Sequence, residues 1–208
     1  MTAPHGTTPS ALPGDVTQQL HDASAGDRAA YDRLFALAYD ELQGVAARQL
    51  RRGLAQRAID PAELVSELYL KLRDQLRMDW AGRAHFYGVA ARAMRQILVD
   101  LARRQQAAKR GGGDWQPTTL TGKQLPADVA LEEVLALDAV LEQLAPRQRQ
   151  VVELRFFAGA SEQEIAEVLG TSTRTVQREW TRARAWLYRA LYATDGTPAG
   201  PPHGDAPA

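Results

Sequence analysis

Residues 161–178 read SEQEIAEVLGTSTRTVQR, and this stretch predicts a helix, a tight turn and a second helix. Ser161 followed three residues later by Glu164 is a capping box, in which each side chain satisfies a backbone N–H at the start of the first helix. Ala166 and Gly170 fall where a helix-turn-helix needs a small residue at the helix crossing and a residue tolerant of positive φ at the turn. The spacing therefore indicates a helix-turn-helix.

The second helix of this motif separates an apolar face from a polar one. Apolar residues recur at steps of three and four and form an inward stripe of Val176, Trp180, Ala183, Leu187 and Leu191. Arginines, hydroxyls and a glutamine lie at the helix start and on other faces, where such groups pair with base edges and phosphates. The predicted DNA-binding residues are Ser172, Thr173, Arg174, Thr175, Gln177, Arg178 and Arg182. The alternative is a solvated surface helix, but the cap, the turn glycine and the polar start together favour DNA binding.

Charge is distributed unevenly along the 208 residues, although 25 basic and 25 acidic residues cancel overall. A basic block contains seven cations and only Asp100 as an acid: Arg83, Arg92, Arg95, Arg103, Arg104, Lys109 and Arg110. The next segment, 114–142, is acidic, with Lys123 as its only cation. Local basic surfaces bind polyanions whatever the total charge, so the pattern suggests two DNA contacts joined by a segment of another kind.

Several classes of protein are excluded or disfavoured by composition. The chain has no cysteine, which rules out disulfides and thiolate metal sites. No apolar run approaches the length of a membrane span, and the start lacks the features of a signal peptide, so we expect a soluble cytoplasmic protein. The histidines are scattered and no catalytic motif is present. We therefore expect no enzyme, no cofactor, no metal and no small-molecule substrate.

The chain reads as all-α, with two small helical domains and a flexible linker. Residues 1–14 and 193–208 are rich in Pro, Gly or Thr and are expected to be disordered tails. Helical periodicity covers 15–108, is interrupted by the Gly- and Pro-containing stretch 109–128, and resumes over 129–192. Within the first domain, a helix is expected to begin at Asp60-Pro61 and another to run from Ala84 toward Arg104.

Aromatic side chains precede the basic helix of the first domain. Trp80, His85, Phe86 and Tyr87 cluster at its entrance, and Arg92, Arg95, Gln96, Arg103 and Arg104 lie along it. Aromatic rings beside arginines can hold unstacked bases, because stacking contributes about 1–3 kcal/mol per base. The simpler alternative is that some of these rings are core residues.

Three stretches together resemble the bacterial sigma factors of the extracytoplasmic-function group. They are DPAELVSELYLKL at 60–72, RAHFYGVAARAMRQILVDLARRQQAAKRGGG at 83–113 and LAPRQRQVVELRFFAGASEQEIAEVLGTSTRTVQREWTRARAWL at 144–187. The resemblance extends over about residues 15–192. It implies a region-two helical bundle, 15–108, and a region-four helix-turn-helix domain, 129–192, joined by the linker.

The resemblance also implies partners and roles for particular residues. Core RNA polymerase would bind through its clamp to the helix at 60–72, with Asp60, Glu63, Leu64, Glu67 and Leu68 as contacts. The segment from Trp80 to Arg104 would recognise and melt the minus-ten promoter element, and the helix-turn-helix would read the minus-thirty-five element. An anti-sigma factor is a further candidate partner.

The main alternative is a stand-alone helix-turn-helix regulator whose first half senses a signal or dimerises. The helix-turn-helix by itself does not separate the two, because its pattern is also similar to that of response-regulator output domains. A regulator of this kind usually needs dimer symmetry and a palindromic site. A sigma factor needs neither, but it must bind the polymerase.

Overall fold

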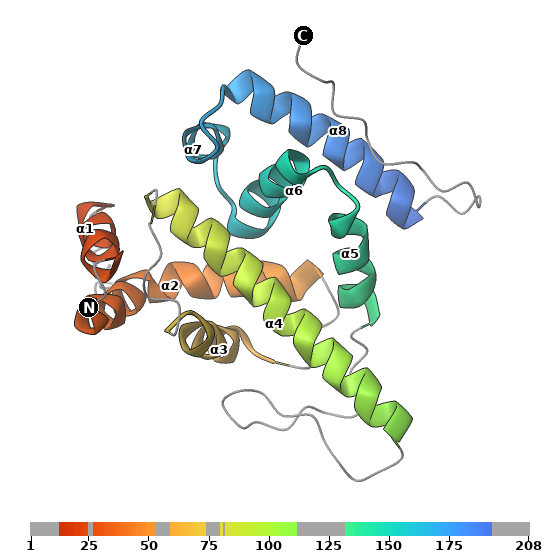
Figure 1. Cartoon of the computed structure of the whole chain (residues 1–208), viewed down its shortest axis with the longest axis horizontal. Coiled ribbons are helices and arrows are strands. Elements are labelled where there is room, and N and C mark those ends of the chain that lie inside the picture. The colour runs from red at the N-terminus through yellow and green to blue at the C-terminus, as the bar shows by residue number, and fades with distance from the viewer. Residues whose placement is uncertain are drawn as a thin grey trace, which may run out of the picture.

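The computed structural model describes residues 13–24, 27–52, 59–73, 80, 82–111 and 132–192, and all regular structure within them is helical (Figure 1). The all-α prediction is therefore confirmed. No helix in these ranges is long and apolar enough to span a membrane. The elements are α1 Pro13–Ser24, α2 Arg28–Arg52, α3 Pro61–Arg73, α4 Arg83–Gly111, α5 Glu132–Glu142, α6 Pro146–Val152, the π-helical turn η2 Glu153–Ala158, α7 Glu162–Val168 and α8 Thr173–Tyr192.

The helix ends follow local chemistry that can be read in the sequence. Asp60 Oδ1 accepts the backbone N–H of Glu63 at 2.8 Å and begins α3. The predicted capping box of Ser161 and Glu164 is present in full at α7. Gly170 has a φ of 58° at the turn, a conformation that a side chain would strain. The helix-turn-helix prediction is thus confirmed in its details.

Helices α1 to α4 form the first helical unit (Figure 1). Within it, α2, α3 and α4 pack around an aromatic cluster. Phe35 makes edge-to-face contacts with Tyr69 at 5.3 Å and with Phe86 at 6.0 Å between ring centroids. The hydroxyl of Tyr31 donates to the backbone oxygen of Tyr69 at 2.9 Å. This cluster therefore joins α2 to both α3 and α4.

Helices α5 to α8 form the second unit. Ile165 and Ala166 of α7 pack against Val176 of α8 and Val151 of α6. Trp186, farther along α8, is among the largest fully buried side chains of the described residues, and the predicted inward stripe did not include it. Leu191, which the stripe did include, is partly exposed at the end of α8.

The two helical units are packed against each other. Helix α4 contacts η2, α5 and α7, and Figure 1 shows it running beside α5. One cluster of buried residues contains side chains from both units. Gly88 of α4 lies against Leu154 of η2 so closely that a methyl group at position 88 would overlap the leucine Cδ2. Arg48 of α2 donates from Nη2 to the backbone oxygen of Ala158 at 2.7 Å.

The predicted linker, 109–128, agrees only in part with the observed helices. Helix α4 continues through Lys109 and Arg110 to Gly111, beyond the expected end near Arg104. Residues 112–131, which contain the rest of the predicted linker, lie outside the described residues. The predicted tail 193–208 lies outside them entirely, and of the predicted tail 1–14 only residues 13 and 14 are described, as the start of α1.

Candidate nucleic-acid and polymerase interfaces

The residues predicted to read DNA from the helix-turn-helix gather at the start of α8. Ser172, Thr173, Arg174, Gln177 and Arg178 are exposed, whereas Thr175 and Arg182 are half-buried. Val176 and Ala183 lie on the opposite face and are fully buried. Ser172 Oγ accepts the backbone N–H of Thr175 at 3.2 Å and so caps α8. The geometry leaves a polar face free of protein cover at the N-terminal half of the helix, which is the part that enters the major groove in this motif.

A chain of polar contacts holds Gln177 in place. Its amide Nε2 donates to Glu162 Oε2 at 2.6 Å, and the other carboxylate oxygen of Glu162 pairs with Arg155 Nη1 at 2.5 Å. The Arg155 guanidinium carbon lies 5.0 Å from the ring centroid of Trp180. The hydrogen bonds from Arg155 and then from Gln177 lower the pKa of Glu162, so the carboxylate is ionised at neutral pH. Nothing in the helical periodicity indicated this contact between α7 and α8.

The polar residues of α4 that were predicted to contact the minus-ten element fall into two groups. Arg92, Gln96, Arg103 and Arg104 are exposed, as expected for DNA contacts. Arg95, also predicted to contact the minus-ten element, is only 3% exposed, so its guanidinium does not face solvent while the two units are packed together. The cause is the packing of the second helical unit against α4.

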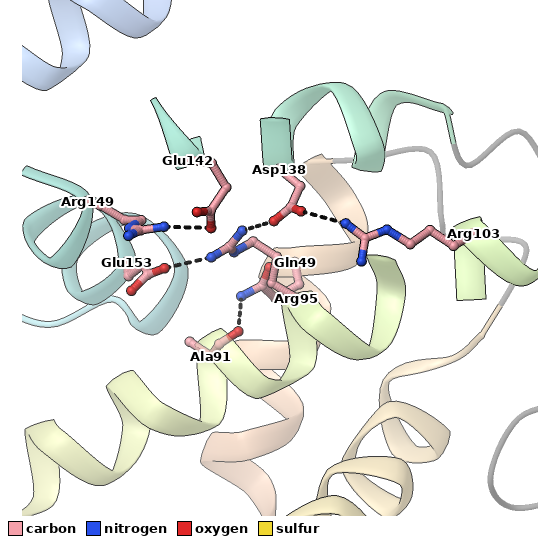
Figure 2. A network of polar contacts seen from close by, with 8 residues as sticks. All are labelled: Gln49, Ala91, Arg95, Arg103, Asp138, Glu142, Arg149 and Glu153. Carbon is pink, nitrogen blue, oxygen red and sulfur yellow. Dashed lines mark hydrogen bonds and ion pairs between the residues drawn. The ribbon is translucent and has the colours of Figure 1, made fainter. Parts of the chain in front are cut away.

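Figure 2 shows the network around Arg95. The guanidinium pairs with Asp138 of α5 through Nη1 and with Glu153 of η2 through Nη2, the latter at 2.6 Å. Arg103 Nη2 lies 3.8 Å from the other oxygen of Asp138. Arg149 and Glu142 form a 2.6 Å pair beside it. Acids of the second unit therefore enclose Arg95, whereas Arg103 stays 66% exposed at the edge of the network.

Two of the four aromatic side chains at the start of α4 belong to the core. Phe86 is 0% exposed and Tyr87 is buried, so the expectation that their rings are open to unstacked bases is wrong in this arrangement. Phe86 lies edge-on beneath Trp80, with ring centroids 5.4 Å apart. Trp80 and His85 are half-buried and keep an open side, and burial lowers the pKa of His85. Both buried rings project from α4 into the bundle, which composition alone could not indicate.

Helix α3 presents a different face from the one expected to dock on the polymerase. Leu64 and Leu68 are fully buried and Glu67 is 1% exposed, so these three side chains do not form a docking surface here. Asp60 is exposed and Glu63 is half-buried. The reason is that the apolar stripe of α3, with Glu67 beside it, faces α2 and α4.

Two apolar grooves were missed by sequence reasoning. The first lies between α2 and α3, next to the 40% exposed Tyr39, and is lined by Phe35, Ala36, Tyr39, Val65, Ser66, Tyr69 and Leu70. The second lies between α5, η2 and α8 and includes Leu137, Phe156, Trp180, Leu187 and Leu191, with Tyr188 69% exposed at its edge. Tyr39 follows Phe35 by four residues, which is the one local signal that could have indicated the first groove.

Within the described part of the chain, no group of three or more His, Asp or Glu side chains is arranged to hold a metal ion. The polar clusters consist of cation–carboxylate pairs and hydrogen-bonded caps. Their chemistry is that of binding surfaces and of contacts between helices.

Comparison with known proteins places both halves in one family. The model of the ECF sigma factor family matches residues 13–193, which include all the described helices of both units up to the end of α8. No curated protein sequence matches the chain. Among solved structures, CnrH in complex with the cytosolic domain of CnrY is 22% identical, with 87% of this chain and 99% of that chain covered and a TM-score of 0.41. The chain therefore belongs to the ECF sigma factors, and it binds core RNA polymerase and directs promoter-specific initiation of transcription.

Proposed function

We propose that this sigma factor reads the minus-thirty-five element with the exposed N-terminal half of α8. The observation that supports this most directly is the separation of faces on α8. Its predicted DNA residues lie at the solvent side while Val176 and Ala183 anchor the other side in the core. Arg174 and Arg178 are both exposed and one turn apart, so they share a face of α8 and both can reach one stretch of major groove.

The minus-ten contact is proposed for the exposed stripe of α4. Arg92, Gln96 and Arg103 recur at steps of four and seven, which keeps them on one side of the helix, and Arg104 lies beside them. Trp80 and His85 stand at the helix entrance with an open side each. Phe86 supports Trp80 from below, so we assign it to positioning that ring rather than to holding a base.

Both contacts require the two units to separate on the promoter. The minus-ten and minus-thirty-five elements lie about 25 base pairs apart, which is about 85 Å along straight DNA. In the closed arrangement α4 contacts α7, the partner of α8 in the helix-turn-helix. Residues 112–131 would extend to at most about 70 Å, which is enough, together with the helices they join, for the two units to reach both elements. We therefore assign 15–108 and 129–192 to separate domains that part on DNA.

For polymerase docking we propose the groove between α2 and α3, with Asp60 and Glu63 at the start of α3. Tyr39, Tyr69 and Leu70 offer apolar area there that the bundle itself does not bury. The groove between α5, η2 and α8, beside Tyr188, is a separate apolar surface that suits a regulatory protein such as an anti-sigma factor. The chain contributes binding rather than a catalytic step, and it acts where the polymerase and the promoter are, in the cytoplasm.

Reconstitution with core polymerase tests these assignments. The full chain is mixed with core enzyme, and DNA carrying randomised promoter regions is selected for binding and transcription. We expect enrichment of two elements about 25 base pairs apart. Tyr39→Ala, which removes the 40% exposed ring from the groove, should reduce core binding, and Ser66→Ala at the groove rim serves as the control. Enrichment of a single element, or unchanged core binding by Tyr39→Ala, would contradict the respective assignment.

A further inference from the structure

Glu162 stands between the helix-turn-helix core and Gln177, one of the residues proposed to contact bases. It is the first residue of α7, after the Ser161 cap, and it reaches across to α8. Its two carboxylate oxygens have different partners: one accepts from Arg155 at 2.5 Å and the other accepts from Gln177 at 2.6 Å. The carboxylate thus bridges a half-buried arginine and an exposed amide.

This bridge determines which way the Gln177 amide points. A carboxylate can only accept hydrogen bonds, so the group facing Glu162 must be the amide nitrogen. The opposite orientation would bring the amide oxygen against a negatively charged oxygen. The carbonyl oxygen of Gln177 is therefore on the branch directed away from Glu162, and the second N–H remains available beside it.

The position of Glu162 is itself restrained. Arg155 lies with its guanidinium over the Trp180 ring, and Trp180 packs against the buried cores of the second unit. A rotation of the Glu162 carboxylate would break the pair with Arg155. Charge-assisted hydrogen bonds are shorter and stronger than neutral ones, and Glu162 makes one with each carboxylate oxygen, so the bridge favours one orientation of the carboxylate.

A fixed amide orientation has a direct consequence for base reading. In the major groove adenine presents an N6 amino donor beside the N7 acceptor, whereas guanine presents acceptors at both O6 and N7. A glutamine with its oxygen and one N–H turned to the DNA matches adenine at both atoms. Against guanine, its oxygen would face O6.

We propose that Glu162 is a specificity-determining positioning residue, which orients the Gln177 amide so that it selects adenine over guanine in the minus-thirty-five element. The proposal rests on the assignment of α8 to that element. It gives Glu162, an acid that would otherwise be unfavourable near DNA phosphates, a function that its charge alone does not suggest.

The test measures base preference rather than total affinity, because a merely structural role of Glu162 would alter the amount of active protein and leave the preference unchanged. Holoenzyme made from the full chain is first selected on a randomised minus-thirty-five region with the wild-type chain and with Gln177→Ala. The base pair at which the two differ is the one that Gln177 reads. Competition between adenine and guanine at that pair is then measured for wild type, Glu162→Ala and Glu162→Gln.

Glu167→Ala is the matched control. Glu167 is an exposed acid on the same helix, and its carboxylate accepts from Gln163 at 3.4 Å rather than from α8. The Glu167→Ala variant removes one negative charge from α7, as Glu162→Ala does, but leaves the hydrogen bond of Gln177 in place. We expect wild type and Glu167→Ala to favour adenine by about fivefold or more, as a bidentate contact does, and both Glu162 variants to move toward equal binding.

Three results would overturn the proposal. A wild-type preference for guanine at the Gln177 pair would contradict the assigned orientation. An unchanged adenine preference in Glu162→Ala would show that the Gln177 amide keeps its orientation without Glu162. The assignment of α8 to the minus-thirty-five element would still stand in that case. If Gln177→Ala changed no base preference at any position, the base contact of Gln177 itself would be wrong, and that result depends on no Glu162 variant.

Discussion

Helices α4 and α8 have the same kind of sequence and different surroundings. Both are long amphipathic helices in which arginines alternate with apolar residues. The arginines at the start of α8 face solvent, whereas α4 lies beneath the second helical unit, which buries Arg95 between two carboxylates. The comparison teaches that a basic amphipathic pattern predicts the helix and its two faces but not what covers the polar face.

The largest expected effect tests whether Phe86 belongs to the core. Phe86→Ala should lower the free energy of unfolding by about 3–5 kcal/mol, because a fully buried ring is lost and a cavity remains. Urea denaturation followed by circular dichroism measures this. Arg174→Ala, at an exposed position of α8, should remain within about 0.5 kcal/mol of wild type. A stable Phe86→Ala protein that fails only in promoter melting would restore the ring to a base-binding role.

The next prediction concerns the packing of the second helical unit against α4. Arg95→Ala leaves the buried Glu153 without its cation and the half-buried Asp138 with only Arg103 at 3.8 Å, which costs up to about 3–5 kcal/mol if the units stay packed. We therefore expect the units to separate. The chain has no cysteine, so fluorophores on Asp40→Cys and Arg189→Cys, both at exposed sites, can report the distance by energy transfer. Arg92→Ala on the exposed side of α4 is the control, and equal transfer in the two variants would contradict the prediction.

A third change opens the same interface without removing a charge. Gly88→Ala places a methyl group on Leu154 Cδ2, and overpacking of this kind costs about 1–3 kcal/mol, partly offset by the better helix propensity of alanine. Energy transfer should fall. Gly44→Ala is the matched control in α2, because its nearest neighbour would be Arg48 Nη1 at 3.7 Å. Adding Leu154→Ala to Gly88→Ala should restore the closed state; if it does not, the clash is not the cause.

The fourth prediction concerns the exposed helix. Arg178→Ala should weaken specific minus-thirty-five binding by about 1–3 kcal/mol if the guanidinium contacts a base edge in bidentate fashion. The stability of the chain should change by at most about 1 kcal/mol, because the Arg178 side chain is 57% exposed, although its partner at 3.3 Å, Glu179, is buried. Binding of holoenzyme to matched and mismatched promoters measures the effect. An equal loss on every sequence would mark Arg178 as a phosphate contact.

The smallest expected effect concerns how the stability of the chain depends on pH through the capping box of α7. Hydrogen bonds from the backbone and hydroxyl of Ser161 lower the pKa of Glu164. Because the folded pKa lies below the unfolded one, the stabilisation is present above the unfolded value of about 4.3 and is lost as pH falls through the depressed folded pKa. Glu164→Gln keeps a capping partner without a titrating group, so its acid unfolding profile should be flatter in this range. Identical profiles in wild type and Glu164→Gln would contradict this.

Local signals predicted much of the second unit and less of the first. Ser161, Glu164 and Gly170 act within a few residues of one another, so their roles could be read directly, and the structure confirms them. Helix α3 began at Asp60 as expected, for the same reason. Which side of α3 is buried depends on two helices distant in sequence, and Glu67, assigned to the surface, is in the interior.

The sequence by itself determined the all-α class, the helix starts, the turn at Gly170 and the polar and apolar faces of α8. Each of these depends on hydrogen bonds and side-chain periodicity within one or two turns. Only the tertiary structure decided that Arg95 is enclosed by acids of the second unit, that Phe86 is core, and that Gln177 donates a hydrogen bond to Glu162. Those outcomes come from segments that are far apart in the chain, or on different helices, being brought into contact by the burial of apolar surface.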